Sequence, residues 1–335
     1  MIIENFHHEP GVHCGSVAMA DMLRWAGVDL SEPMVFGLGA GLGFYYLQSD
    51  YMSPTRQIVG RSIHLEENVA EALGLELVEH RTSDGEEGWR GVRSAVESGR
   101  PALVQCDLSE LPYWESSTPF NGHRIVVAGY DDADDSVYVA DTHFEGLECI
   151  DREALHRARA SDAPPSFGNR FAWWELEPAS CGDIQGAIRE AIARNVEEIE
   201  SDESGFTGMP GLDLFREEVA GWRDLDDAEW CYRFAYQCIE KRGTGGAMFR
   251  NLYRKFLSEA ADYVPEILQF QLPVSMSRNA DAWSTLATYL KAMALYIGTE
   301  GEEPDEDPNH HVESMAEAVY QFESTFWDRA RQMFC

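Results

Sequence analysis

The strongest constraint on the fold is a change of periodicity at Pro178. Between Cys14 and Glu177, two helical stripes are followed by short apolar runs of the kind that form strands. After Pro178 the pattern is helical, with almost no strand signal. This order predicts an α+β domain at residues 1–178 and an all-α domain at residues 179–335. With 335 residues and 44% apolar content, each domain is long enough to bury a core.

Apolar stripes that stop at a glycine predict helices at residues 14–26 and 65–73, and a third helix is expected near residues 87–97. The expected strands are residues 75–79, 101–107, 123–130, 136–141 and 171–177. The helices expected after Pro178 are residues 184–199, 212–222, 227–241, 247–263, 279–296 and 312–334. The acidic run 299–308 is expected to be a solvated loop.

Cys14 has the setting of a reactive thiol, because it begins a predicted helix directly after a loop. The N–H groups of a first helical turn and the helix macrodipole favour the thiolate, which is the nucleophilic form. The other cysteines show no CxxC spacing, so neither a zinc site nor a disulfide framework is predicted. We interpret them as free thiols: Cys106, Cys149, Cys181, Cys231, Cys238 and Cys335.

The chain is strongly acidic, with a formal net charge of −33, and only three of its 26 basic residues are lysines. A field of this sign repels nucleic acids and anionic membranes, so neither is an expected partner. The composition favours an acidic surface hydrated in a salty cytoplasm, and a specific basic partner is the alternative. No apolar run reaches the roughly 20 residues of a membrane span and no signal peptide is recognisable, so a soluble cytoplasmic protein is expected.

A thiolate nucleophile needs a base, and usually a group that orients that base. His123 opens an apolar strand, and Asp141 ends the next predicted strand. Taken singly, His123 could be a surface histidine and Asp141 a strand terminator. Together with Cys14, they form the set that nucleophilic catalysis requires.

The hairpin between the two strands decides whether this pair can meet. An acidic five-residue loop after Tyr130 would pair Tyr130 with Ser136, and so place Asp141 opposite Ile125. His123 is then a diagonal neighbour on the same face, roughly 7 to 8 Å away. A register shifted by one residue would turn Asp141 to the other face.

Three segments together resemble a known family: Cys14-Gly15-Ser16, the run 123–131, and the strand that ends at Asp141. They are similar to papain-like cysteine peptidases of the bacteriocin-processing type. The run from Gly27 through residues 31–44 extends the resemblance, over about residues 7–178, to the N-terminal domain of the butirosin biosynthesis acyltransferase family. That resemblance implies a papain-like fold, in which a thiol takes an acyl group from a carrier-protein thioester and passes it to an amine.

The resemblance also implies roles for individual residues. Cys14 would be the nucleophile, His123 the general base and then acid, and Asp141 the orienting carboxylate. Peptidases of this type place a glutamine six residues before the cysteine as an oxyanion donor, and here that position is His8. With the Cys14 N–H as the first donor, His8 is a candidate for the second, or a mere loop residue.

The glycine run 37–43 lacks both GxGxxG spacing and the Lys-Ser/Thr of a P-loop, so nucleotide binding is not predicted. Gly39, Gly41 and Gly43 are instead expected in a tight loop bordering the substrate channel, with a plain connector as the alternative.

The helical half resembles the uncharacterised domain that often follows this N-terminal type. It carries a local cluster of positive charge at Lys241, Arg242, Arg250, Arg254 and Lys255. We hypothesise that this cluster, with a helix start near Ala247, binds an anion such as a pantetheine phosphate or a substrate carboxylate. The alternatives are pairing with carboxylates of the chain itself, and a glycine segment that only separates two helices.

The leading interpretation is a thiol acyltransferase with an acyl-Cys14 intermediate, a carrier protein or other thioester donor as partner and a small amine as acceptor. A cysteine peptidase or amide hydrolase is the first alternative, because the same triad serves both reactions. A non-catalytic binding protein with the same fold is the second. No metal or organic cofactor is expected, since His310 and His311 are adjacent in an acidic loop and not at ligand spacing.

Overall fold

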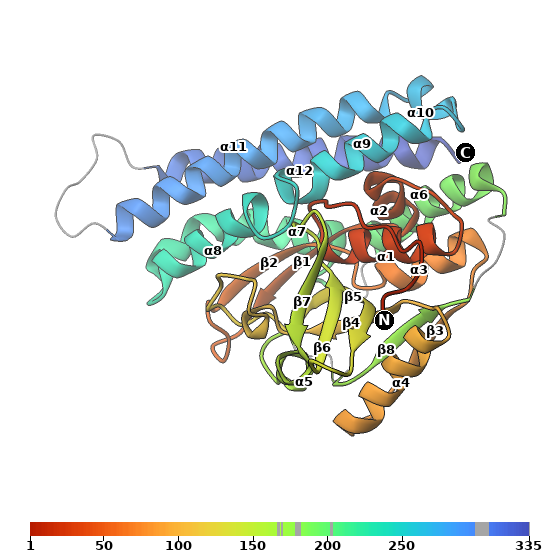
Figure 1. Cartoon of the computed structure of the whole chain (residues 1–335). Helices are drawn as coiled ribbons and strands as arrows, with labels where there is room; N and C mark the ends of the chain where they lie inside the picture. Colours follow the sequence, from red (N-terminus) through yellow and green to blue (C-terminus); the bar gives the residue numbers. More distant parts are fainter. Residues whose placement is uncertain (166–167, 169, 178–181, 202–203, 299–307, 335) are drawn as a thin grey trace. The chain divides into compact units, whose positions relative to one another are not determined.

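The computed structural model describes residues 1–165, 168, 170–177, 182–201, 204–298 and 308–334 (Figure 1). The chain forms two compact units. The first contains Met1–Val35 and Glu66–Asp183, and the second contains Phe36–Leu65 and Ile184–Cys335. The predicted domain boundary at residue 178 and most of the acidic run 299–308 lie outside the described residues. Residues 36–65 group with the helical half, which differs from the predicted division.

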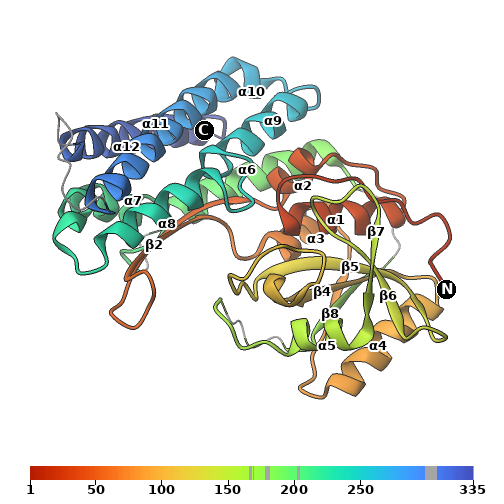
Figure 2. The same cartoon turned by 60° about the vertical axis from the view of Figure 1, so that its left-hand side comes forward.

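The first unit is built on a six-stranded antiparallel sheet with the order β3-β8-β4-β5-β6-β7. Its strands are β3 (Leu77–His80), β4 (Ala102–Cys106), β5 (His123–Asp131), β6 (Ser136–Ala140), β7 (Leu147–Asp151) and β8 (Trp173–Leu176). Its helices are α1 (Cys14–Trp25), α3 (Leu65–Leu73), α4 (Gly85–Glu97) and α5 (Arg152–Ala160), and α2 (Glu32–Leu38) leads into the second unit. Figures 1 and 2 show α1 on one side of the sheet and α4 and α5 on the other.

A buried apolar core joins this sheet to its helices. Val92 and Val96 of α4 and Leu155 of α5 pack with strand residues such as Val104 and Ile125. The predicted α+β class, with a cysteine-bearing helix against an antiparallel sheet, is confirmed. Strand β7 and helix α5 were not predicted, because β7 is a short, half-exposed edge strand with two acidic residues and α5 is rich in charged residues.

The β5–β6 hairpin contains an irregularity that the sequence did not reveal. At the turn, Asp131 pairs with Ser136, one residue away from the predicted register. A register shift between Val127 and Gly129 then restores the predicted pairing, so that Val126 lies opposite Ala140. Continuing this register places the next residue, Asp141, beside Ile125. The predicted placement of Asp141 is therefore correct because a β-bulge compensates for the shorter turn.

The described residues after 182 form helices, as predicted, and the second unit adds to them a two-stranded antiparallel hairpin from the N-terminal half of the chain. The hairpin is β1 (Leu42–Gln48) and β2 (Arg56–Arg61). The helices are α6 (Ile184–Glu200), α7 (Gly208–Glu218), α8 (Ala228–Glu240), α9 (Arg250–Ala260), α10 (Glu266–Gln269), α11 (Leu272–Gly298) and α12 (Asn309–Gln332). Helices α11 and α12 run side by side in both views, and the hairpin packs on α6, α7 and α8.

Specific contacts explain why the hairpin belongs to the helical unit. Asn195 of α6 is fully buried, and its side chain bonds both the N–H and the C=O of Leu42, at 3.3 and 2.7 Å. The Phe44 ring lies 5.8 Å from the ring of Trp283 on α11. Such contacts join residues more than 150 positions apart, and the local periodicity of residues 36–65 contains no trace of them.

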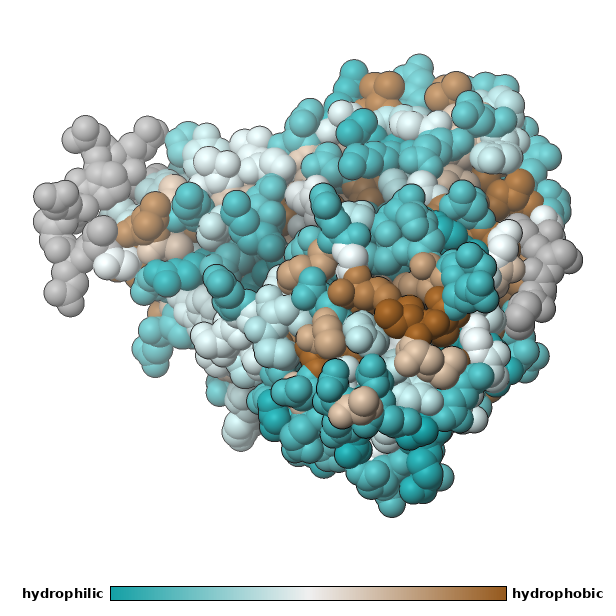
Figure 3. All heavy atoms as spheres, in the orientation of Figure 1, coloured by the Kyte–Doolittle hydropathy of each residue, from teal (hydrophilic) through white to brown (hydrophobic). Residues whose placement is uncertain are grey.

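None of the helices in the described part of the chain is long and apolar enough to cross a membrane. The face of the molecule drawn in Figure 3 is mostly hydrophilic, in line with the high content of acidic residues.

Candidate active site

The cysteine predicted to be reactive begins helix α1, and the loop before it is tightly held. His13 is the N-cap, and its Nδ1 accepts a hydrogen bond from the N–H of Ser16 at 3.2 Å. The Glu32 carboxylate accepts from the backbone N–H groups of Val12 and His13 and from the Ser16 hydroxyl, at 2.8–3.1 Å. Cys14 is half-buried and therefore stands at a rigid helix start with part of its surface accessible.

His123 connects Cys14 to Asp141. The imidazole Nε2 lies 2.8 and 2.9 Å from the two carboxylate oxygens of Asp141, and both side chains are almost fully buried. The ring also forms a hydrogen bond with Cys14, for which Nδ1 is the remaining nitrogen. The structure thus brings together the three residues predicted from the sequence, with His123 between Cys14 and Asp141.

Electrostatics favour an ion pair between the ring and the carboxylate. Burial by itself lowers the pKa of His123, but the charge and hydrogen bonds of Asp141, with a contribution from Cys14, outweigh burial and raise this pKa to about 10. Burial by itself raises the pKa of Asp141, and the positive charge of His123 and the bonds the carboxylate accepts bring it below its usual range. The ring is therefore an imidazolium at neutral pH, beside an ionised carboxylate.

Two residues that the sequence analysis missed complete the surroundings of Asp141. The Tyr113 hydroxyl and the Trp114 indole N–H donate to its Oδ2 at 2.9 and 2.7 Å. The edge of Trp114 also meets the His123 ring, with the centroids 5.7 Å apart at 86°. The sequence signal for them was an adjacent Tyr and Trp in the long connection between β4 and β5. The hydroxyl of a buried Tyr and the indole N–H of a buried Trp usually find a hydrogen-bond partner.

Comparisons with known proteins identify the family of the chain. A family model described as Butirosin biosynthesis protein H, N-terminal, matches residues 13–142, a range that includes Cys14, His123 and Asp141. A second model, a domain of unknown function (DUF4872), matches residues 153–329, which is more than half of the chain. The chain belongs to the family in which these two domains follow one another.

A solved structure described as a C39-like peptidase from Bacillus anthracis is also similar, with a TM-score of 0.36 and 17% identity over 53% of this chain and 98% of that chain. No curated protein sequence matches the chain. The region that matches the Butirosin biosynthesis protein H N-terminal model carries a cysteine at a helix start and a buried histidine on a strand, which are the residue types of a cysteine enzyme.

The other cysteines differ from Cys14 in their surroundings. Cys106 pairs with His123 across β4 and β5, and burial raises its pKa well above the usual range. Burial also raises the pKa of Cys231, and that of Cys238 to about 12. Cys149 is exposed, whereas Cys181 and Cys335 lie outside the described residues.

His8 does not have the predicted position of an oxyanion donor. Its Nδ1 lies 2.6 Å from Oδ2 of Asp21, and its Nε2 lies 2.9 Å from the backbone oxygen of Phe144. Since both ring nitrogens are engaged with these oxygens, neither is left to donate to a substrate oxyanion. The prediction for His8 is therefore wrong. The reason is its bond to Asp21 on α1, which the spacing of the sequence did not reveal.

The three glycines assigned to a substrate channel lie in the second unit. The predicted loop is instead the end of α2 and the start of β1. A Cβ on Gly41 would lie 2.5 Å from the Phe36 carbonyl oxygen, and one on Gly43 would lie 2.8 Å from the Arg61 backbone. Close packing within the unit explains both glycines, and a role of Gly39, Gly41 and Gly43 at a substrate channel stays a prediction.

The predicted anion-binding cluster in DUF4872 is not formed as expected. Arg250 is fully buried, and its Nε donates to Glu323 at 2.7 Å. The α-helix does not start at Ala247, because residues 247–249 form a short 3-10 turn with positive φ angles and α9 begins at Arg250. Arg250 is therefore an internal partner of a carboxylate, which was the alternative interpretation.

Of the four remaining cations of that cluster, Lys241, Arg242 and Lys255 are exposed, and Arg254 is half-buried. The adjacent histidines also differ from expectation, because His310 and His311 lie in the first turn of α12 and not in a loop. The His311 ring stacks on Tyr289 at 4.7 Å.

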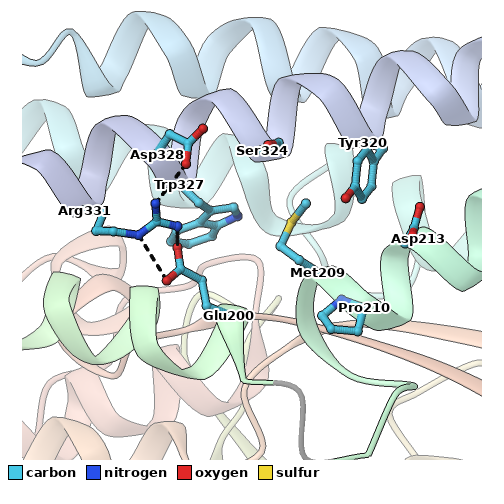
Figure 4. Close-up of a pocket in the computed structure, with 9 residues that line it drawn as sticks. All are labelled: Glu200, Met209, Pro210, Asp213, Tyr320, Ser324, Trp327, Asp328 and Arg331. Carbon is cyan, nitrogen blue, oxygen red and sulfur yellow. Dashed lines mark hydrogen bonds and ion pairs between the residues drawn. The ribbon is translucent and has the colours of Figure 1, made fainter.

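A surface pocket of about 520 Å³ lies between α6, α7 and α12 of the second unit (Figure 4). Trp327, Met209 and Pro210 line it, and Arg331 pairs there with Glu200 and Asp328. It contains none of the residues predicted to be functional, and its charged side chains have partners from the chain itself.

Proposed function

We propose that this protein is a thiol acyltransferase that moves an acyl group from a thioester to an amine. One observation carries the proposal: the buried His123–Asp141 pair bonds a cysteine at a helix start. The imidazolium and the helix N-terminus both favour a thiolate at Cys14. The butirosin biosynthesis protein H match supports this reading, because the family resemblance implies acyl transfer to an amine.

The first half of the reaction forms an acyl-enzyme. The Cys14 thiolate attacks the thioester carbonyl, and the N–H groups at the start of α1 stabilise the resulting oxyanion. As the tetrahedral intermediate collapses, the bond to the donor sulfur breaks and His123 gives its proton to that sulfur. The acyl group is then held on Cys14 and the imidazole is neutral.

The second half returns the enzyme to its starting state. The amine attacks the acyl-Cys14 carbonyl, and the neutral imidazole accepts the proton that the nitrogen loses. The amide leaves, and the thiolate and the imidazolium are restored. Asp141 keeps the ring oriented in both halves, because it bonds Nε2 whichever state Nδ1 adopts.

Incubation with an acyl thioester, with and without a panel of small amines, tests the proposal. Mass spectrometry should show an acyl adduct on Cys14 and a new amide when an amine is present. Cys14→Ser should abolish the adduct, whereas the exposed Cys149→Ser should leave it unchanged. Free acid as the sole product would identify a hydrolase, and a protein without any adduct would be a binding protein.

A further inference from the structure

A second buried histidine links the helix that carries the nucleophile to the loop that follows Asp141. The His8 side chain is 3% exposed, and that of its partner Asp21 is 1% exposed. Asp21 lies on α1, seven residues beyond Cys14. The other partner, Phe144, lies three residues beyond Asp141. The imidazole of His8 is thus bonded to both elements at once.

The two partners determine the charge of this ring. A carbonyl oxygen only accepts hydrogen bonds, so Nε2 donates to Phe144. An ionised Asp21 also accepts, so Nδ1 donates as well, and a ring that donates from both nitrogens is an imidazolium. The Arg24 guanidinium lies 3.1 Å from the other oxygen of Asp21, which favours the ionised carboxylate.

The charged groups around the pair support this assignment. Burial by itself lowers the pKa of His8, but Asp21 and the backbone carbonyls of the loop after β6 outweigh burial and raise it. Burial raises the pKa of Asp21 above its ordinary value, and His8 and Arg24 oppose burial only in part, so the ionised form of Asp21 depends on these two positive partners. Arg24 also pairs with Glu9 and Asp29 at the surface, at 2.9 and 3.3 Å.

Two more hydrogen bonds join the same parts of the chain. The N–H of Gly11 donates to the Thr142 carbonyl at 2.7 Å, and the His143 Nδ1 lies 3.1 Å from the Gly11 carbonyl. These bonds hold the loop before Cys14. The hydrogen bonds of His8 differ from them, because they connect the loop after Asp141, through Phe144, to Asp21 on α1 itself.

We propose that His8 is a positioning residue, whose imidazolium fastens the loop after Asp141 to the helix that carries Cys14. Without this tie, the two hydrogen bonds of Gly11 would still join the loop to the segment before Cys14, but α1 would lose its bridge to the loop through His8. A displacement of about 1 Å at a reacting group costs on the order of 100-fold in rate. The inference rests on the proposed function, because it assigns His8 a part in keeping that site in register.

His8→Gln tests the proposal, because glutamine is uncharged and cannot donate in two opposite directions. His7→Gln is the matched control, since His7 is 63% exposed and pairs with Glu9 at the surface. Two quantities are measured at pH 6 to 9: the rate of Cys14 alkylation by iodoacetamide, and kcat and KM for acyl transfer from a thioester. We expect His8→Gln to lower the alkylation rate and kcat between about 10-fold and about 100-fold, with KM changed less than about twofold. His7→Gln should match the wild type.

The double variant His8→Gln with Asp21→Asn separates positioning from a general loss of structure. Two amides can pair without a buried charge, so this variant should recover most of the rate that His8→Gln loses, whereas Asp21→Asn alone should be slow. His8→Gln with wild-type alkylation and kcat would overturn the proposal.

Nitrogen-15 NMR of the wild-type protein provides a readout that depends neither on the proposed reaction nor on the folding of a variant. The His8 ring should show two protonated nitrogens at pH 7, and a neutral ring would overturn the assignment. If wild-type Cys14 reacted no faster than the exposed Cys149, the proposed function would fail. The protonation state of the His8 ring would still show whether an imidazolium ties the loop after Asp141 to α1.

Discussion

Replacing Asp141 with asparagine tests whether a carboxylate charge keeps His123 protonated. The substitution preserves the size of the side chain, and Tyr113 and Trp114 can still donate to the amide oxygen. It removes the negative charge that raises the pKa of His123 against the lowering effect of burial. We therefore expect the pKa of His123 to fall from about 10 to about its ordinary value of 6.5.

The size of this change follows from the two pKa values. The difference between 6.5 and about 10 corresponds to about 5 kcal/mol of interaction between the charged ring and its surroundings. At pH 8, the fraction of molecules with a protonated His123 would fall from about 0.99 to about 0.03. In the proposed reaction, acylation needs that proton for the leaving sulfur, so it should slow by at least about 30-fold at pH 8.

The same shift predicts how stability depends on pH. A pKa that is raised in the folded state stabilises that state fully below the unfolded value of 6.5, and this contribution is lost as the pH rises through about 10. The wild-type protein should therefore lose part of its free energy of unfolding between pH 6.5 and pH 10. Asp141→Asn should lose little over this range, because the ring is already neutral.

Nitrogen-15 NMR of the His123 ring measures the titration directly, and single-turnover acylation at pH 8 measures its kinetic consequence. The control is Asp132→Asn, an exposed hairpin carboxylate that pairs with Arg93 and does not contact the site. A His123 ring that titrates at the same pH in Asp141→Asn and in the wild type would refute the ion-pair argument. So would an acylation rate at pH 8 within twofold of the wild type.

Three further outcomes are expected. Tyr113→Phe removes one charged hydrogen bond to the triad carboxylate, so acylation should slow by about tenfold, and an unchanged single-turnover rate would contradict this. Gly15→Ala would place a Cβ 2.9 Å from a carboxylate oxygen of the buried Glu66, so calorimetry should show a lower Tm, with a cost of about 1–3 kcal/mol. Arg250→Met leaves Glu323 buried without its cation, so chemical denaturation should show a loss of about 3–5 kcal/mol, and a stable variant with altered donor binding would restore the anion-site hypothesis.

The elements of the candidate site were predictable from the sequence because their signals are local. A helix start at Cys14 needs only the residues next to it, and the strands that carry His123 and Asp141 have the periodicity of a hairpin. The predicted register near Asp141 was correct, but the prediction did not include two features of the hairpin. The turn is one residue shorter than predicted, and a bulge shifts the register back by one residue. A bulge adds one residue to one strand, and the alternation on either side of it still resembles an ordinary strand.

The remaining features depend on contacts that no local pattern records. Tyr113 and Trp114 come from a connection without periodicity, and only the folded chain brings them to Asp141, 27 or 28 residues away. The charge cluster near Arg250 was misread for a related reason. A count of positive residues in a segment does not tell which of them a distant carboxylate such as Glu323 will bury.

Burial also separates the electrostatics of the site from those of the surface. The chain carries a net charge of −33, and exposed charges of this kind are screened beyond roughly 3 Å at 1 M salt. The His123–Asp141 pair is almost fully buried, where mobile ions screen little. The protonation of His123 therefore depends on its few neighbours and not on the acidic surface, so changes in surface charge or in salt should leave the chemistry at Cys14 largely unaltered.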